Sequence, residues 1–390
     1  MLRIRRLIAK YNSVQNSLMV FGILLPLSIQ FSNYFFVFNL ILLFISSKGK
    51  KIEWISLLIL SIPALVPLLS ILLHNETFTF YSFEVRLPFI ATALLVGFFS
   101  IDKSIFTGFY KGIIIGSLIA VLFHFVENTS FGLALKSVSI FDFSYTPLFA
   151  TISIIYLWFT KTRINDKIKV ALTVLFFVSI FINGNFFFIS AAFIISIAVV
   201  IVKGSSQIAK ISIAVVVLIT SFLLYKGPEI QSLIAPFQKT QKLGASDRLA
   251  QWQCVLEVMK GNELIGVGYS NRMDFLLNCY HMHNMNKAEN LALNAHNEYL
   301  DFFLVLGYLG VIALLIYFIN ALFVAYDSKE IKYLLIVSLI ALFSLTENVF
   351  TRQKGVMITS ITYLMIYASR GTKSKEESAT HMEVGETIDD

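Results

Sequence analysis

Residues 299–325 read YLDFFLVLGYLGVIALLIYFINALFVA, an almost entirely apolar run. A helix rises about 1.5 Å per residue, so about 20 apolar residues cross the roughly 30 Å hydrocarbon core of a bilayer. The run is therefore predicted to be a membrane-spanning helix. It decides the fold class that we expect, which is an all-α integral membrane protein.

The composition of the whole chain agrees with this prediction. Of its 390 residues, 57% are hydrophobic and only 14% are charged, and the mean hydropathy is +0.76. A soluble domain carries roughly a quarter charged residues, so this chain lacks the polar surface to face water all round. The formal net charge of +7 comes from short basic clusters between apolar runs. Since they form no stripe on a soluble face, we expect no nucleic-acid partner.

Eleven further apolar runs bring the expected number of transmembrane helices to about twelve. Several are shorter than the roughly 20 residues of a full span, so some are expected to extend into flanking polar residues or to pair as a re-entrant hairpin. The runs are 17–31, 33–45, 52–73, 87–101, 112–126, 146–160, 168–182, 186–202, 211–225, 333–345 and 356–368.

The positive charges orient these spans. With a cytoplasmic N-terminus, about twenty Lys and Arg residues fall on the inner side, whereas the short outer loops carry only four, namely Arg86, Lys136, Arg352 and Lys354. This is the positive-inside pattern, and it predicts that both termini are cytoplasmic. The basic and apolar N-terminal segment lacks a small-x-small cleavage site, so we interpret it as an uncleaved first helix.

The expected organisation has four parts. Residues 1–225 form a membrane bundle of nine spans, residues 226–297 form a large periplasmic loop, residues 298–369 carry the last three spans, and residues 370–390 form a disordered cytoplasmic tail. Only the loop has room for chemistry. Its sequence predicts helices, one of which begins with an N-cap near Ser246 and ends before Gly261.

Both cysteines, Cys254 and Cys279, lie in this loop. An oxidising compartment would permit a disulfide worth roughly 3 kcal/mol in the chain-entropy model, and two free, buried thiols are the alternative. Cys279, His281 and His283 also offer metal-ligand atoms, but this one tight cluster lacks a distant fourth ligand, so we expect no metal. His124, inside a span, could belong to a proton relay or face a neighbouring helix.

The segment from Arg248 to Gly310 resembles the signature region of the O-antigen ligase and polymerase superfamily. The family pattern has an arginine shortly before a tryptophan, a glycine pair, and then His-Asn-x-x-Leu opening a membrane helix with glycines one to two turns further on. The spacing of ten residues between His296 and Gly307 resembles the ligase branch. The matching stretches are RLAQW at 248–252, GVGY at 266–269, HNEYL at 296–300 and GYLG at 307–310.

The resemblance implies a membrane glycosyltransferase of the bacterial inner membrane with a periplasmic active site. Its expected partners are an undecaprenyl-diphosphate-linked glycan donor, a glycolipid or glycan acceptor, and membrane lipids, with no cofactor. An O-antigen ligase would use lipid A–core as the acceptor, a repeat-unit polymerase another carrier-linked repeat, and related enzymes a protein side chain. The outer loops hold no Asp-x-Asp pair for a metal, so we expect metal-independent transfer.

Arg248 and His296 are the catalytic candidates. The planar fork of arginine matches phosphate oxygens and could take the place of a metal at the diphosphate, and the first turn of a helix adds free N–H groups there. Histidine titrates nearest to neutral pH, which suits a base or an orienting partner for the acceptor hydroxyl. An exposed cation at a helix end and an interfacial histidine bound to a carbonyl are the plainer alternatives.

Five further residues at the outer ends of spans are candidates for binding substrate. Arg86 could bind a carrier phosphate or pair with Glu84, and Asn297 and Tyr299 could contact substrate or cap and anchor a helix. Glu347 and Arg352 could reach the same cavity or form a solvated cluster. The candidates are Arg86, Asn297, Tyr299, Glu347 and Arg352.

Two features test the resemblance. The family leads us to expect an arginine in a short outer turn, but that turn reads Asn183-Gly184-Asn185, so Arg86 or Arg352 would have to substitute or the protein would be a polymerase. A polysaccharide or lipid transporter is the rival of another class. It predicts mid-membrane ionisable residues and paired broken helices in repeated halves, whereas polar residues here gather at the outer face.

Overall fold

The computed structural model describes residues 2–77, 80–126, 145–160, 164–182, 191, 194–195 and 245–386. These ranges are helical almost throughout, and the only strands within them are the short antiparallel pair β1 (Lys48–Gly49) and β2 (Phe99–Ser100). The chain divides into two compact units, which are described separately. The first comprises Met1–Leu42 with Ser104–Gln241, and the second Leu43–Lys103 with Lys242–Asp390.

Among the described residues, four stretches of helix are long and apolar enough to cross a membrane. They confirm the helical fold class and the membrane character, whereas the number of twelve spans and the periplasmic loop stay predictions. The expected spans at 186–202 and 211–225 lie almost wholly outside the described residues. The four stretches are α2 (Ile29–Ser46), α3 (Trp54–Leu73), Lys103–Phe123 and α16 (Glu298–Asp327), and the shorter apolar helices are α5 (Leu87–Phe98), α8 (Thr146–Phe159) and α17 (Ile331–Phe343).

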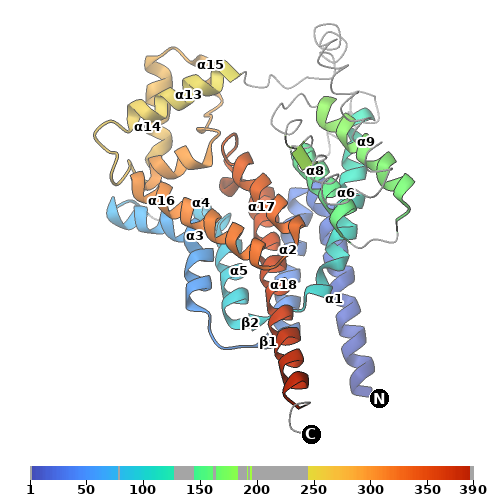
Figure 1. Ribbon diagram of the computed structural model, residues 1–390. Helices are drawn as coiled ribbons and strands as arrows, with labels where there is room; N and C mark the ends of the chain where they lie inside the picture. Colours follow the sequence, from blue (N-terminus) through green and yellow to red (C-terminus); the bar gives the residue numbers. More distant parts are fainter. Residues whose placement is uncertain are drawn as a thin grey trace. The chain divides into compact units, whose positions relative to one another are not determined.

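The first unit is built on a close approach of two helices (Figure 1). Helix α1 (Leu2–Leu27) packs along α6 (Thr107–Val126), and α8 and α9 (Asp166–Ile182) also pack against α6. Three glycines of α6, spaced four apart, lie against the α1 backbone, where a Cβ at any of them would overlap main-chain atoms. Such small-xxx-small stripes let membrane helices pack closely. The three are Gly108, Gly112 and Gly116.

The second unit is organised around α16. This helix packs against α3, α17 and α18 (Gln353–Glu386), and α18 also packs against α5. Phe350, in the short 3-10 helix η3 (Val349–Thr351), lies at the centre of an aromatic cluster with Phe89, Phe302 and Tyr317. The aromatic packing fixes η3 beside the beginning of α16, where polar side chains also gather.

Helix α16 is broken at Leu306 and Gly307. The apolar sequence of this segment does not indicate such a break. Gly307 has φ 60° and ψ −148°, a conformation that is essentially limited to glycine. The chain before α14 fills the break. The amide of Tyr308 donates to the Glu263 carbonyl at 2.8 Å, and the amide of Val267 donates to the Leu304 carbonyl at 2.8 Å. Because a bilayer offers no water, a broken helix needs such partners from the protein itself.

The remaining helices precede α16 or flank the spans. Helix α13 begins at Ala245 rather than after the expected N-cap at Ser246, and Gly261, with φ 86°, follows its end. Helix α18 runs to Glu386, so residues 370–386 are helical where we expected disorder; their Lys, Glu and Ala residues favour helix. The bounds are α4 (Phe80–Glu84), η1 (Lys103–Phe106), α13 (Ala245–Val258), α14 (Arg272–Met282) and α15 (Asn286–Asn290).

Candidate functional site

Arg248 and His296 meet on one carboxylate, that of Glu347. The Nη2 atom of Arg248 lies 2.9 Å from Oε1 of Glu347, and Nδ1 of His296 lies 3.1 Å from Oε2. Arg248 also donates from Nη1 to the Thr346 carbonyl at 2.8 Å. All three side chains are partly buried. The two residues that carry the family pattern are thus held by a third from the last loop.

Each member of this group comes from a different element. Arg248 stands in the first turn of α13, as expected. His296 lies just before α16 in a left-handed conformation, with φ 45°, and its amide donates to Oδ1 of Asn294 at 3.1 Å. The next residue, Asn297, is the N-cap of α16 and accepts from two amides of the first turn. The cap fixes where the helix begins, and so it fixes the backbone of His296.

Two hydrogen bonds tie this corner to its neighbours. The indole N–H of Trp252 on α13 donates to the Ala295 carbonyl at 2.9 Å, which joins α13 to the residue before His296. The amide of Asn297 donates to Oδ1 of Asn348 at 2.7 Å, which joins the same corner to the loop that carries Glu347. The two catalytic candidates are therefore positioned by backbone contacts on both sides.

The arrangement fixes the tautomer of His296. A carboxylate only accepts hydrogen bonds, so in the neutral imidazole Nδ1 of His296 donates to Glu347 and Nε2 carries the lone pair. This Nε2 atom is buried and has no hydrogen-bond partner among the described residues. A histidine oriented by a carboxylate at one nitrogen, with the other nitrogen free, is the arrangement of a general base.

A second group of charged side chains lies buried beside the first turns of α16. Nε of Arg272 lies 3.1 Å from Oδ1 of Asp301, and Nη2 of Arg86 lies 4.0 Å from Oδ2. Nη1 of Arg86 donates to the Tyr269 hydroxyl at 2.8 Å, and both guanidinium groups lie over the Tyr269 ring. Near them, Oε2 of Glu298 accepts from the amide of Phe350 at 2.8 Å. The network joins α5, α14, η3 and α16.

The partners of Arg272 keep its guanidinium protonated. Burial by itself would lower its pKa, but the facing Asp301 carboxylate and Tyr269 outweigh that effect and raise the pKa above its ordinary value. Arg272 is therefore a permanent cation at working pH. A buried charge with a partner is tolerated, whereas the same charge without one is strongly destabilising.

Comparison with known proteins places this geometry in a family. Residues 143–315 match the family model described as O-antigen ligase. This match supports membership of the chain in the O-antigen ligase and polymerase superfamily. The matched range contains Arg248, His296 and Asp301, which is where the sequence resemblance was strongest, and ends before Glu347. No curated protein matches the chain.

The match to the O-antigen ligase family points to glycosyl transfer of the O-antigen ligase type, with glycolipid or glycan substrates, in a multi-pass membrane protein. The family does not separate a ligase from a polymerase.

The other candidate residues are placed as follows. Arg86 is 1% exposed and pairs within the buried network rather than with Glu84, so its guanidinium does not face solvent. Tyr299 donates from its hydroxyl to the Ala341 carbonyl at 3.2 Å, which anchors α16 to α17. Arg352 is exposed and takes no part in the ion pairs of Glu347. The turn at 183–185 and the side chain of His124 lie outside the described residues.

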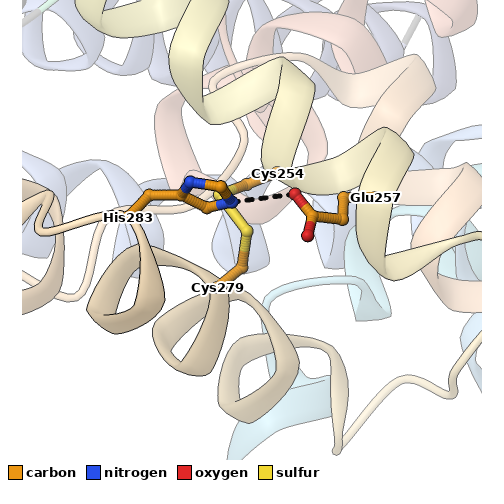
Figure 2. Close-up of a disulfide and its surroundings, with 4 residues drawn as sticks. All are labelled: Cys254, Glu257, Cys279 and His283. Carbon is orange, nitrogen blue, oxygen red and sulfur yellow. Dashed lines mark hydrogen bonds and ion pairs between the residues drawn. A yellow bond between two sulfur atoms is a disulfide. The ribbon is translucent and has the colours of Figure 1, made fainter.

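The cysteines of the loop are bonded to each other, which decides between the two alternatives left open by the sequence. Cys254 of α13 and Cys279 of α14 form a disulfide with a Cα–Cα distance of 5.8 Å. Figure 2 shows His283 and Glu257 beside it, with Nε2 of His283 at 2.8 Å from Oε2 of Glu257. The disulfide links the helix of Arg248 to the helix that begins with Arg272.

The sequence did not identify the buried network. Tyr269 and Glu298 lie within the quoted family stretches, and Asp301 follows directly. Only the fold shows that Tyr269 and Asp301 contact Arg86 and Arg272, and that Glu298 accepts from the amide of Phe350. A signal was present in Glu298 and Asp301, two acids in the first turn of an otherwise apolar run. Acidic residues are favourable near a helix N-terminus, and in a membrane helix such charges call for partners.

Proposed function

We propose that the protein is an O-antigen ligase that transfers an oligo- or polysaccharide from undecaprenyl diphosphate to lipid A–core on the periplasmic face of the bacterial inner membrane. The observation that carries the proposal is the meeting of Arg248 and His296 on Glu347. The contact brings together Arg248, a candidate phosphate ligand, and His296, a candidate base that directly precedes α16. Both residues lie inside the region that matches the family.

In the proposed reaction, the acceptor hydroxyl oxygen attacks the anomeric carbon of the donor sugar. The bond from that carbon to the diphosphate oxygen breaks, and undecaprenyl diphosphate leaves with the electron pair. Nε2 of His296 takes the hydroxyl proton, and the Glu347 carboxylate stabilises the imidazolium that forms. A neutral hydroxyl is thereby made a better nucleophile without a metal ion.

Arg248 is proposed to stabilise the negative charge that develops on the diphosphate. Its guanidinium has five N–H donors, of which two contact Thr346 and Glu347. The remaining donors are available for phosphate oxygens, and the first-turn amides of α13 add to the same anion affinity. Arg352, exposed near Glu347 in sequence, is the further cation proposed to contact the donor.

The proposed roles of the other candidates follow from their contacts. Arg86 is a positioning residue rather than a phosphate ligand in this arrangement, because its guanidinium is buried against Tyr269 and Asp301. Asn297 and Tyr299 hold the first turn of α16 through the cap and the Ala341 carbonyl. They act on substrate through the position that they give His296.

The test is a gel of surface glycans from a deletion strain complemented with variants. Wild type should restore glycan attached to lipid A–core, whereas His296→Ala and Arg248→Ala should be inserted and folded but inactive. The matched control is His281→Ala, since His281 is 77% exposed and pairs only with Glu289 among the described residues. Its rescue should equal that of wild type.

The accumulated intermediate then decides the type of transfer. Carrier-linked polymer in the His296→Ala strain supports a ligase, whereas accumulated single repeat units would indicate a polymerase. Full rescue by both His296→Ala and Arg248→Ala would overturn the catalytic assignment and reopen the transporter alternative.

A further inference from the structure

A cluster of metal-ligand side chains surrounds the disulfide. Cys254 and Glu257 come from α13, Cys279 comes from α14, and His283 directly follows α14. The ligand atoms of Cys254, Cys279 and His283 all lie within 4.8 Å of one another. Glu257 joins them through its 2.8 Å contact with Nε2 of His283 (Figure 2). This cluster is separate from the group of Arg248, His296 and Glu347. No ion pair among the described residues joins the two groups.

The spacing of these residues is that of paired metal ligands. Cys254 and Glu257 are three apart on α13, so they lie on one helix face. Cys279 and His283 are four apart, across the end of α14. Zinc sites commonly take two ligands from each of two such pairs. The sequence alone showed Cys279 and His283 without distant ligands. The fold supplies them, because α13 packs against α14 and brings Cys254 and Glu257 to the same place.

The donor set suits one class of ion. Two thiolates, an imidazole and a carboxylate are the ligand types of Zn²⁺, and thiolates select against Mg²⁺ and Ca²⁺. Bonds of about 2.0 to 2.3 Å place tetrahedral ligand atoms about 3.3 to 3.8 Å apart. Once the sulfurs are no longer bonded, they need to separate only by a small movement to reach that spacing around a shared ion.

The burial of the four residues fits a site with an entrance. Cys254 and Cys279 are buried, so thiolates there would be shielded from bulk water. The side chains of His283 and Glu257 are 51% and 46% exposed and lie near the disulfide (Figure 2). An ion can therefore enter from solvent past the imidazole and the carboxylate.

We propose that Cys254, Glu257, Cys279 and His283 bind one Zn²⁺ ion when the disulfide is reduced. The two thiols are present before the new chain is oxidised, and a dithiol reductant regenerates them: the protein disulfide gains two electrons and two protons, and the reductant is oxidised to its own disulfide. Binding then releases both thiol protons as the two Zn–S bonds form.

The consequence of this site is that α13 stays joined to α14 in both oxidation states. The disulfide makes that link in the oxidised chain, and the ion makes it in the reduced chain. Arg248 lies on α13 six residues before Cys254, and α14 begins with Arg272, which is bound to Asp301. Either link therefore restrains the helix that positions the proposed diphosphate ligand. The metal proposal itself does not rest on glycan transfer.

The test uses the full-length protein in detergent, with and without reduction. A phosphine reductant is applied and removed by gel filtration, and free thiols are counted with a maleimide. Bound metal is then measured by elemental analysis after exposure to Zn²⁺, and Co²⁺ is used as a spectroscopic probe, since thiolate ligation gives sulfur-to-cobalt charge-transfer bands. Competition with a chelator of known affinity gives the Kd.

Reduced wild type is expected to bind one Zn²⁺ per chain with thiolate bands for Co²⁺, and the oxidised protein is expected to lack that ion. Even removing a partner of a metal ligand weakens binding about 10- to 100-fold, so His283→Ala and Glu257→Gln should each weaken it at least about 10-fold. The matched control His281→Ala should bind as wild type. Absence of thiolate bands in fully reduced wild type, or unchanged Kd in His283→Ala, would overturn the proposal.

Discussion

Replacing Glu347 with Gln is the sharpest test of the proposed base. The carboxylate accepts from two donors at once, Arg248 Nη2 at 2.9 Å and His296 Nδ1 at 3.1 Å. A glutamine has only one acceptor atom. Because a guanidinium can only donate, the amide oxygen will face Arg248 and the NH₂ group will face His296. Nδ1 must then accept, so the ring proton moves to Nε2, the atom that is proposed to receive the acceptor's proton.

The size of the effect follows from this change of tautomer. A positioned general base contributes about 10²- to 10⁴-fold to a rate, so kcat of Glu347→Gln should fall by at least about 100-fold, or about 2.7 kcal/mol in the barrier. The KM for the donor should not rise, because the substitution removes a negative charge beside Arg248 rather than a phosphate ligand. Loss of kcat with unchanged or lower KM distinguishes a disturbed base from a disturbed binding site.

The assay uses purified protein in nanodiscs with carrier-linked glycan and lipid A–core acceptor, and measures kcat and KM from the ligated product. Asp274→Asn is the matched control, since it makes the same carboxyl-to-amide change at an exposed position of α14 in the same unit. It should leave both constants at wild-type values. A Glu347→Gln enzyme that keeps more than about a tenth of wild-type kcat would refute the reasoning, because its His296 would then not need the carboxylate.

Three further predictions concern the frame around the site. Gly307→Ala should lower the yield of folded protein and its Tm, because φ 60° with ψ −148° costs an alanine about 1 to 3 kcal/mol and the new Cβ would overlap the backbone of Glu263 and Leu264; a wild-type Tm would count against the break in α16. Asp301→Asn should lower the free energy of unfolding by about 3 to 5 kcal/mol, since it leaves Arg272 buried without its carboxylate. Denaturant unfolding in detergent measures this change, and an unchanged free energy would show that the pair is not formed. A variant with serine at both Cys254 and Cys279 should have a free energy of unfolding about 3 kcal/mol lower than that of the oxidised wild type, because it lacks a link across 25 residues. An equal Tm for the two proteins under oxidising conditions would exclude the disulfide.

The sequence predicted most helices of the membrane region to within a few residues. The expected run at 299–325 became Glu298–Asp327, and the run at 52–73 became Trp54–Leu73. Such runs are predictable because apolar length alone decides them. The first helix was predicted, but its beginning was not, since α1 begins at Leu2 among basic and polar residues that carry no apolar signal, before the expected run at 17–31. The helical tail was missed for the same reason.

The break in α16 could not be predicted from local sequence. Leu306 and Gly307 stand in an apolar run that would continue as helix if nothing else intervened. The backbone that satisfies the break comes from Glu263 and Val267, about 40 residues earlier, so the broken conformation is stable only in the assembled fold. A glycine at this point permitted the break, but a pattern of apolar residues cannot indicate where its partners come from.

The structure brings three of the candidate site residues together through contacts that the sequence did not indicate. Arg248 and His296 carry a motif, and Glu347 was a candidate because of its place in the last loop. Their ion pairs join residues 99 and 51 positions apart, which no spacing in the sequence indicates. Arg86 shows the opposite case. A cation at the outer end of a span suggested a phosphate ligand, but its guanidinium lies in the protein interior against Tyr269.

The buried position of Arg86 gives it a different and more general part in the proposed mechanism. His296 precedes Glu298 by two residues, and Asp301 follows within the same first turns of α16. The ion pairs of Asp301 and the hydrogen bond of Glu298 to the Phe350 amide therefore hold the helix end that follows His296. Arg272, which pairs with Asp301, is the first residue of α14, and the disulfide joins α14 to the helix that carries Arg248. The contacts of Asp301 therefore help to position His296, the proposed base. Through Arg272, α14, the disulfide and α13, they are also connected to Arg248, the proposed phosphate ligand. A general base and an anion-binding arginine act together only when the distance between them is fixed, and this network is what fixes it here.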